Sequence, residues 1–83
     1  MRKVRILIAD DQNLFREGLR SIIDLEPDME VVGTAKSGVE VCEAAQKLLP
    51  DVVILDVDLE QMNGVEATHW IKTNFPSIKV IVL

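Results

Sequence analysis

The 83-residue chain lacks the features of a secreted or membrane-spanning protein. Its one cysteine, Cys42, excludes an internal disulfide framework and a cysteine-based zinc site. No apolar run approaches the roughly twenty residues that cross a bilayer. The stretch Ile6–Ala9, which follows a basic start, is too short for the core of a signal peptide. We therefore expect a reduced, cytoplasmic protein that does not contact the membrane.

Basic residues are also in the minority. The chain has 9 Lys and Arg against 14 Asp and Glu, which gives a formal net charge of −5. Binding to nucleic acid needs a basic surface that neutralises phosphates, so this balance argues against a nucleic-acid-binding chain. The apolar fraction of 48% is ordinary for a folded domain and excludes a disordered acidic tail. The length predicts one small domain over residues 1–83.

Four short apolar blocks predict the strands of a sheet. Val4–Ala9, Val52–Leu55 and Ile78–Leu83 are rich in β-branched residues, which is typical of strands that are buried on both faces of a parallel sheet. Met29–Ala35 is more polar, and we expect it to be an edge strand.

Three segments with apolar residues at helical spacing lie between these blocks. They span Leu14–Ile23, Val41–Leu49 and Val65–Phe75, and a proline follows each, at positions 27, 50 and 76. Asn13 and Ser37 are the expected N-caps of the first two helices. Regular alternation of strands and helices predicts an α/β fold with a parallel sheet covered on both faces.

Three aspartates directly follow predicted strands: Asp10, Asp11 and Asp56. The carboxyl ends of parallel strands lie at one edge of a sheet, so the three side chains converge if the first and third strands are neighbours. A lone aspartate at a strand end is usually a cap or a turn residue, but three that converge favour a cation site. Oxygen ligands of this kind favour Mg²⁺. The side chain of Asp58 is expected to face solvent, while its backbone carbonyl could reach a metal bound by Asp56.

Other polar and reactive residues are given no role in this site. The remaining acidic residues, expected to form a solvated surface, are Asp24, Asp28, Asp51 and the glutamates. His69 is expected at the surface, Trp70 in helix packing or against a partner, and Cys42 in the core as an inert thiol. The segment 10–13 reads D-D-Q-N where a dinucleotide-binding loop would carry glycines, so no nucleotide cofactor is expected.

The motifs resemble the receiver domain of bacterial two-component response regulators. Ile6–Asp11 (I-L-I-A-D-D) resembles the first strand of that family with its acidic pair, and Val53–Asp56 (V-I-L-D) resembles its third strand with the phosphoacceptor. Asn63-Gly64 resembles the loop that follows. Three further segments are similar to the NarL/FixJ (LuxR-type) subfamily: Asp11–Leu19, Glu30–Gly33 and Gly64–Thr68.

The resemblance implies a flavodoxin-like (CheY-like) sheet with strand order 2-1-3-4, lacking the fifth strand and the last two helices. It implies transfer of a phosphoryl group from a sensor histidine kinase to Asp56, with Mg²⁺ as cofactor. Asp11 and Asp56 would bind the ion directly, Asp10 through water and Asp58 through its backbone carbonyl. Such a domain assists its own phosphorylation without being a turnover enzyme. It controls transcription through a DNA-binding helix-turn-helix domain, which is absent from residues 1–83.

Departures from the family pattern lead to two further expectations. Glu60 stands where the family usually has proline, which predicts a changed loop. The family's hydroxyl residue and lysine would lie beyond Leu83, so we expect an N-terminal receiver fragment that switches poorly. Ile78–Leu83 would be an open apolar strand, which favours dimers or a swapped assembly through that edge.

Two other functions remain open at this point. Asp56-Val57-Asp58 resembles the first motif of haloacid dehalogenase-like phosphatases, which also use an aspartate nucleophile with Mg²⁺. That alternative leaves Asp10 and Asp11 unexplained, and no acidic cluster follows Asp58. A phosphorylation-independent interaction module is the second alternative.

Overall fold

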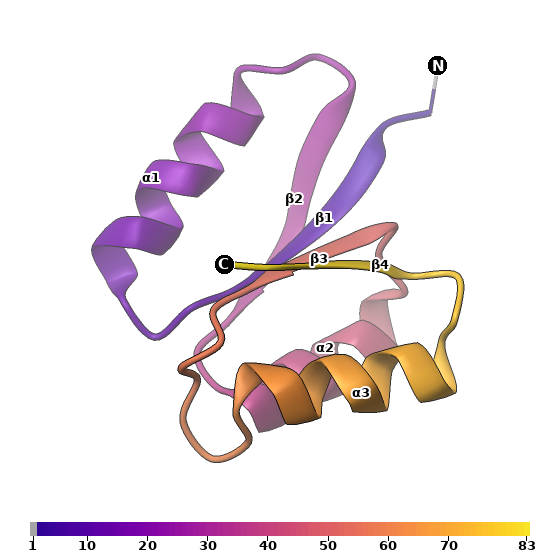
Figure 1. Cartoon of the computed structure of the whole chain (residues 1–83). Coiled ribbons are helices and arrows are strands. Elements are labelled where there is room, and N and C mark those ends of the chain that lie inside the picture. The colour runs from indigo at the N-terminus through magenta and orange to yellow at the C-terminus, as the bar shows by residue number, and fades with distance from the viewer. Residues whose placement is uncertain (1) are drawn as a thin grey trace.

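The computed structural model describes residues 2–83 and contains, over that range, a four-stranded sheet and three helices (Figure 1). The strands lie in the order β2-β1-β3-β4 and every pairing is parallel, which confirms the expected order 2-1-3-4. None of the three helices in this range is long and apolar enough to cross a membrane. The elements are β1 Val4–Ala9, α1 Asn13–Asp24, β2 Met29–Ala35, α2 Gly38–Leu48, β3 Val52–Leu55, α3 Gly64–Asn74 and β4 Lys79–Val82.

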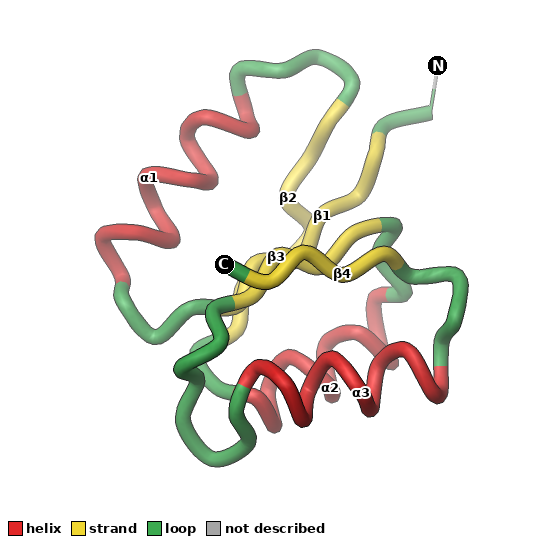
Figure 2. Tube along the Cα trace, in the orientation of Figure 1, coloured by secondary structure: helices red, strands yellow, loops and turns green. Residues whose placement is uncertain are grey.

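The helices form two layers of unequal size on the two faces of the sheet (Figure 2). α1 lies alone on one face and packs on β1 and β2, whereas α2 and α3 pack against each other on the opposite face. Leu7 of β1 is paired with Val53 of β3, and both point toward α2 and α3, because paired residues of parallel strands share a face. Their neighbours Ile8 and Ile54 point toward α1.

The core follows from this alternation. Apolar side chains from alternate positions of the strands meet the apolar stripes of α2 and α3, and the cluster on the α1 side is much smaller. The larger cluster contains Leu7, Ala9, Ala35, Val41, Cys42, Ala45, Val53, Leu55, Leu59, Ala67, Ile71 and Ile78. The smaller cluster contains Ile6, Ile8 and Ile23, with partly buried neighbours around them.

Strand boundaries agree closely with the sequence, with one difference. β1, β2 and β3 have the expected bounds, and β2 is an edge strand as expected. β4 begins at Lys79 and ends at Val82, within the longer apolar block. The Ile78 amide donates instead to the Phe75 carbonyl, at 3.0 Å, so Ile78 belongs to the turn before the strand.

The apolar stripe predicted for α1 is wrong in part. Ile23 is buried, but Leu14 and Ile22 are 87% and 64% exposed. The buried position in the first turn is occupied by Arg16, which is only 6% exposed. Most contacts of the helix are with β1 and β2, so its inward face is narrower than the run of apolar residues suggested.

The predicted helix caps have different outcomes. The Ser37 hydroxyl accepts a hydrogen bond from the Glu40 amide at 3.1 Å, which confirms Ser37 as the N-cap of α2. Asn13 is not the cap of α1. Gln12 occupies that position without a capping side-chain bond, and the Asn13 amide oxygen accepts a hydrogen bond from Arg16 instead.

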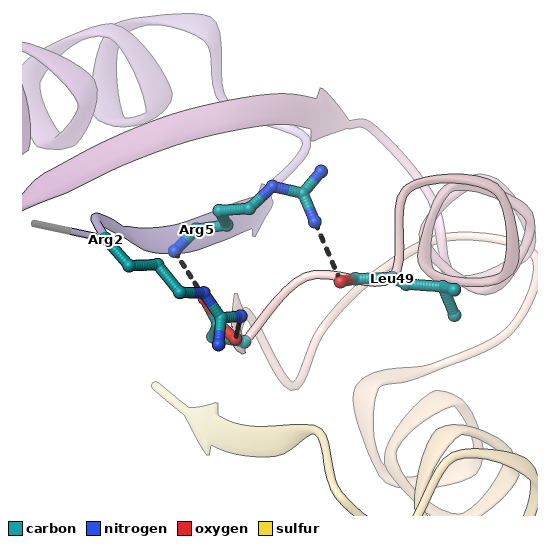
Figure 3. A network of polar contacts seen from close by, with 4 residues as sticks. Arg2, Arg5 and Leu49 are labelled. Carbon is teal, nitrogen blue, oxygen red and sulfur yellow. Dashed lines mark hydrogen bonds and ion pairs between the residues drawn. The ribbon is translucent and has the colours of Figure 1, made fainter.

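The expectation that Asp51 is part of a solvated surface is wrong, because its carboxylate is held by two contacts. Its carboxylate accepts the Arg5 backbone amide at 2.8 Å and forms an ion pair with the Arg2 guanidinium at 2.5 Å (Figure 3). The Arg5 side chain also donates to the Leu49 carbonyl at 2.9 Å. These contacts tie the start of β1 to the start of β3, at the opposite end of these strands from Asp10 and Asp56.

Candidate metal centre

The candidate site lies where β1 and β3 end side by side. Ala9 of β1 is paired with Leu55 of β3, so Asp10 and Asp56 leave the sheet at the same level. The Asp56 amide donates to the Ala9 carbonyl at 3.0 Å, and the Asp10 amide donates to Ala35 of β2 at 3.0 Å. β1 is followed by α1 on one face, and β3 by α3 on the other. Helices that leave adjacent strands on opposite faces open a crevice at the strand ends, where ligands of open α/β sheets bind.

The structure brings Asp10, Asp11 and Asp56 together in this crevice. Each offers one carboxylate oxygen, and the three oxygens lie within 4.8 Å of one another. Asp10 is buried, Asp56 is half-buried and Asp11 is exposed. Three carboxylates at this separation repel one another unless a cation lies between them.

Two of the carboxylates are oriented by the loops that follow them. The Gln12 amide donates to Asp10 Oδ1 at 2.7 Å, and the Asp58 amide donates to Asp56 Oδ1 at 3.0 Å. In each case an aspartate binds the backbone two residues ahead, which is the usual turn-forming contact of this residue type. One oxygen of each carboxylate is thus committed to its own loop, and the second accepts no hydrogen bond from residues 2–83.

Asp58 lies beside the cluster without joining it through its side chain. The side chain is exposed, as expected. Its backbone carbonyl accepts no backbone hydrogen bond within residues 2–83, so this oxygen remains available to a ligand.

The loop from Asp56 to Gly64 is packed tightly against the rest of the molecule. The Gly64 amide donates to the Val57 carbonyl at 2.8 Å. A Cβ on Gly64 would lie 2.5 Å from the Asp56 carbonyl oxygen, so only glycine fits at this close approach. Glu60, which replaces the family's usual proline, accepts the Gly38 amide at 3.1 Å and so ties the loop to the start of α2.

The residues fit a small, hard divalent cation. All three side-chain donors are carboxylate oxygens close enough to share one ion, and the site is open on the side of Asp11. Mg²⁺ prefers oxygen ligands and keeps several waters, so a partly exposed, three-carboxylate site suits it.

Sequence reasoning missed Arg16. This buried side chain donates to the Asp10 carbonyl and to the Asn13 side chain, next to the acidic cluster. The sequence did carry a signal for this role, because Arg16 stands at helical spacing from Leu19 and Ile23, which belong to the predicted apolar stripe of α1.

The residues that were left outside the site remain outside it. His69 is exposed, and Trp70 is half-buried with its ring packed edge-on against Phe75 at a centroid distance of 6.0 Å. Cys42 is buried, with its sulfur 3.7 Å from that of Met62. A hollow of about 640 Å³ runs along α3 past His69 and Trp70 and includes none of the three aspartates.

Comparison with known proteins identifies the family. Residues 6–83 match the family model of the response regulator receiver domain. The chain belongs to the response regulator receiver family. It is accordingly a receiver domain of the two-component type, and the phosphatase alternative is not favoured.

Individual relatives agree with this membership. The chain is 42% identical over 80 residues to the transcriptional regulatory protein LnrK of Bacillus subtilis, which covers 96% of the chain and 36% of LnrK. It is 42% identical over 81 residues to a protein-glutamate methylesterase/protein-glutamine glutaminase of Thermotoga maritima, covering 98% of the chain and 24% of that protein.

Among solved structures, the signal receiver domain of the response regulator NarL from Mycobacterium tuberculosis superposes with a TM-score of 0.94 at 32% identity. The superposition covers 99% of this chain and 66% of that one. This likeness agrees with the NarL/FixJ-type resemblance seen in the sequence. The chain spans about a third or less of the two curated relatives, and the match to proteins with different activities concerns the receiver portion only.

Proposed function

We propose that Asp56 is the phosphoacceptor of this receiver domain and that it receives its phosphoryl group from a phosphohistidine on a sensor histidine kinase. The observation that carries the proposal is the approach of Asp10, Asp11 and Asp56 to within 4.8 Å at the paired ends of β1 and β3. Asp56 is half-buried, whereas Asp11 is exposed and Asp10 is buried. It is therefore accessible to a partner while being held by its loop.

We also propose a ligand set for Mg²⁺ at this site. Asp11 and Asp56 bind the ion through carboxylate oxygens, Asp10 binds through water, and Asp58 contributes its backbone carbonyl. When bound, the ion supplies positive charge that offsets the negative charge of the attacking carboxylate and of the phosphoryl oxygens.

The chain's own residues supply the nucleophile and its orientation. The Asp58 amide holds Asp56 Oδ1, so the second carboxylate oxygen is the one free to attack phosphorus. A bond forms between this oxygen and phosphorus, the phosphorus–nitrogen bond to the histidine breaks, and the electron pair stays with the imidazole, which leaves neutral after taking up a proton. The product is an aspartyl phosphate on Asp56.

The partners of the whole protein are proposed by analogy with its relatives. LnrK is named a transcriptional regulatory protein, and we propose that the protein to which this chain belongs binds DNA through a helix-turn-helix domain outside residues 1–83. We propose a cytoplasmic location, since the single cysteine is unpaired and buried. For the 83-residue chain on its own, we propose self-association through β4, whose Ile81 and Val82 are 50% and 44% exposed.

The test of Asp56 is phosphorylation with acetyl phosphate, read by intact mass. Wild-type protein is expected to gain one phosphoryl group only when Mg²⁺ is present, and Asp56→Asn to gain none. Asp58→Asn is the matched control, because it removes a neighbouring carboxylate but keeps the backbone carbonyl; it is expected to be phosphorylated as wild type. Addition to Asp56→Asn at the wild-type rate would refute the assignment. The extent of phosphorylation of the wild-type chain is a separate test of the expectation that residues 1–83 switch poorly. Rapid and near-complete addition of one phosphoryl group would contradict that expectation.

A further inference from the structure

Arg16 is a buried cation in an unfavourable position. It is 6% exposed and lies in the first turn of α1, where the helix dipole disfavours positive charge. Burial of a charge also costs free energy unless hydrogen bonds compensate for it. The first turn of α1 contains no acidic residue that could balance this charge. A helix built for stability alone would carry an apolar residue here, so the contacts that Arg16 makes need an explanation.

Those contacts are with the loop that carries the acidic pair. One guanidinium nitrogen donates to the Asp10 carbonyl, and the other donates to the Asn13 side-chain oxygen. The two acceptors flank Asp11 and Gln12, so the planar fork of Arg16 spans the turn between β1 and α1. The Arg16 backbone amide adds a third tie, to the Gln12 carbonyl at 3.1 Å.

Asp11 is the member of the cluster that most needs such support. It is exposed, and within residues 2–83 its carboxylate accepts no hydrogen bond, whereas Asp10 and Asp56 are each held by a backbone amide. Its side chain is therefore oriented only by the conformation of the turn in which it sits. Arg16 bridges the two residues that bound this turn.

We propose that Arg16 is a positioning residue for the metal centre: by bridging Asp10 and Asn13 it fixes the turn that presents Asp11 to the divalent cation. The inference rests on the proposed function, because it needs the aspartates to bind a cation. It predicts an effect of definite sign. Removing a positive charge near a cation site should by itself strengthen cation binding, whereas loss of the turn geometry should weaken it. Positioning and simple electrostatics thus predict opposite results.

The test measures Mg²⁺ affinity by titration, followed by the fluorescence of the single Trp70 and by NMR shifts of the loop amides. Arg16→Met is expected to weaken binding by about tenfold or more, in the range found for groups that orient metal ligands. Arg16→Lys keeps the charge but cannot bridge both acceptors, so it is also expected to weaken binding. Asn13→Ala keeps Arg16 and removes one of its two acceptors, and we expect a smaller loss of affinity in the same direction.

Arg20→Met is the matched control. Arg20 is exposed one turn further along α1 and carries the same charge, so its removal is expected to leave the Mg²⁺ dissociation constant within about twofold of wild type. Wild-type affinity, or tighter binding, in Arg16→Lys and Asn13→Ala would overturn the positioning role while leaving the metal site intact. Failure of the wild-type chain to bind Mg²⁺ would instead refute the proposed function, and this inference with it.

Discussion

Replacement of Gly38 by alanine is expected to destabilise the fold strongly. A Cβ on Gly38 would lie 1.7 Å from the Met62 carbonyl oxygen, which would have to retreat by about 1.7 Å to reach ordinary contact at 3.4 Å. The Gly38 amide also donates to the Glu60 carbonyl at 3.1 Å, and such a shift would break this bond. Overpacking typically costs 1–3 kcal/mol and a lost hydrogen bond 0.5–1.5 kcal/mol, partly offset by the lower chain entropy of unfolded alanine. We expect the free energy of unfolding to fall by about 2–3 kcal/mol.

Gly18 provides the matched substitution. It lies in the middle of α1, and nothing lies within 4 Å of the position that its Cβ would occupy. Gly18→Ala should therefore raise the free energy of unfolding by about 0.5–1 kcal/mol, because alanine is the better helix former. Urea unfolding followed by Trp70 fluorescence gives both values on the same scale. A Gly38→Ala variant as stable as wild type would contradict the close packing of α2 against the loop after Asp56.

Three other substitutions or conditions test separate parts of the fold. Ile71→Ala leaves a cavity between α3 and the sheet, where Ile71 is fully buried, and should lower the free energy of unfolding by about 2–5 kcal/mol in the same urea assay. Asp51→Ala should lower it by about 1 kcal/mol through loss of its contacts with Arg2 and Arg5, and added salt should reduce this difference. Burial raises the pKa of the Cys42 thiol, so Ellman's reagent should react slowly in native protein and rapidly in urea. The same shift in pKa gives a contribution to stability that is present below the pKa of the unfolded thiol and lost as pH rises through the higher pKa of the folded thiol; a Cys42→Ala variant should lack this alkaline loss.

The sheet and the approach of the three aspartates were predictable because they depend on short-range patterns. Strands of four to seven residues that alternate with helical segments leave few topologies for a chain of this length. Once β1 and β3 are neighbours, the aspartates that directly follow these strands must lie close together at the same edge of the sheet. The same reasoning gave Ser37 as a cap, since capping depends on residues three positions apart.

Several features that the sequence did not predict depend on contacts between distant segments. The spacing of apolar residues shows which side chains of α1 are apolar, but the sheet beneath the helix decides which of them are covered, and Leu14 and Ile22 are not. The ion pair of Asp51 with Arg2 joins residues 49 positions apart. The demand for glycine at position 38 arises only because the Met62 carbonyl lies against it.

The thin layer formed by α1 has a consequence for local opening of the molecule. α1 is held by a cluster centred on Ile6, Ile8 and Ile23, whereas α2 and α3 share a cluster four times as numerous. Segments with few buried contacts open at lower free energy than the rest of a domain. Amide hydrogens of α1 should therefore exchange with solvent before those of α2 and β3. Each such opening would also detach Arg16 from the loop at Asp10. A cation that binds the ordered loop would therefore slow the amide exchange of α1, although α1 contributes no ligand to the cation.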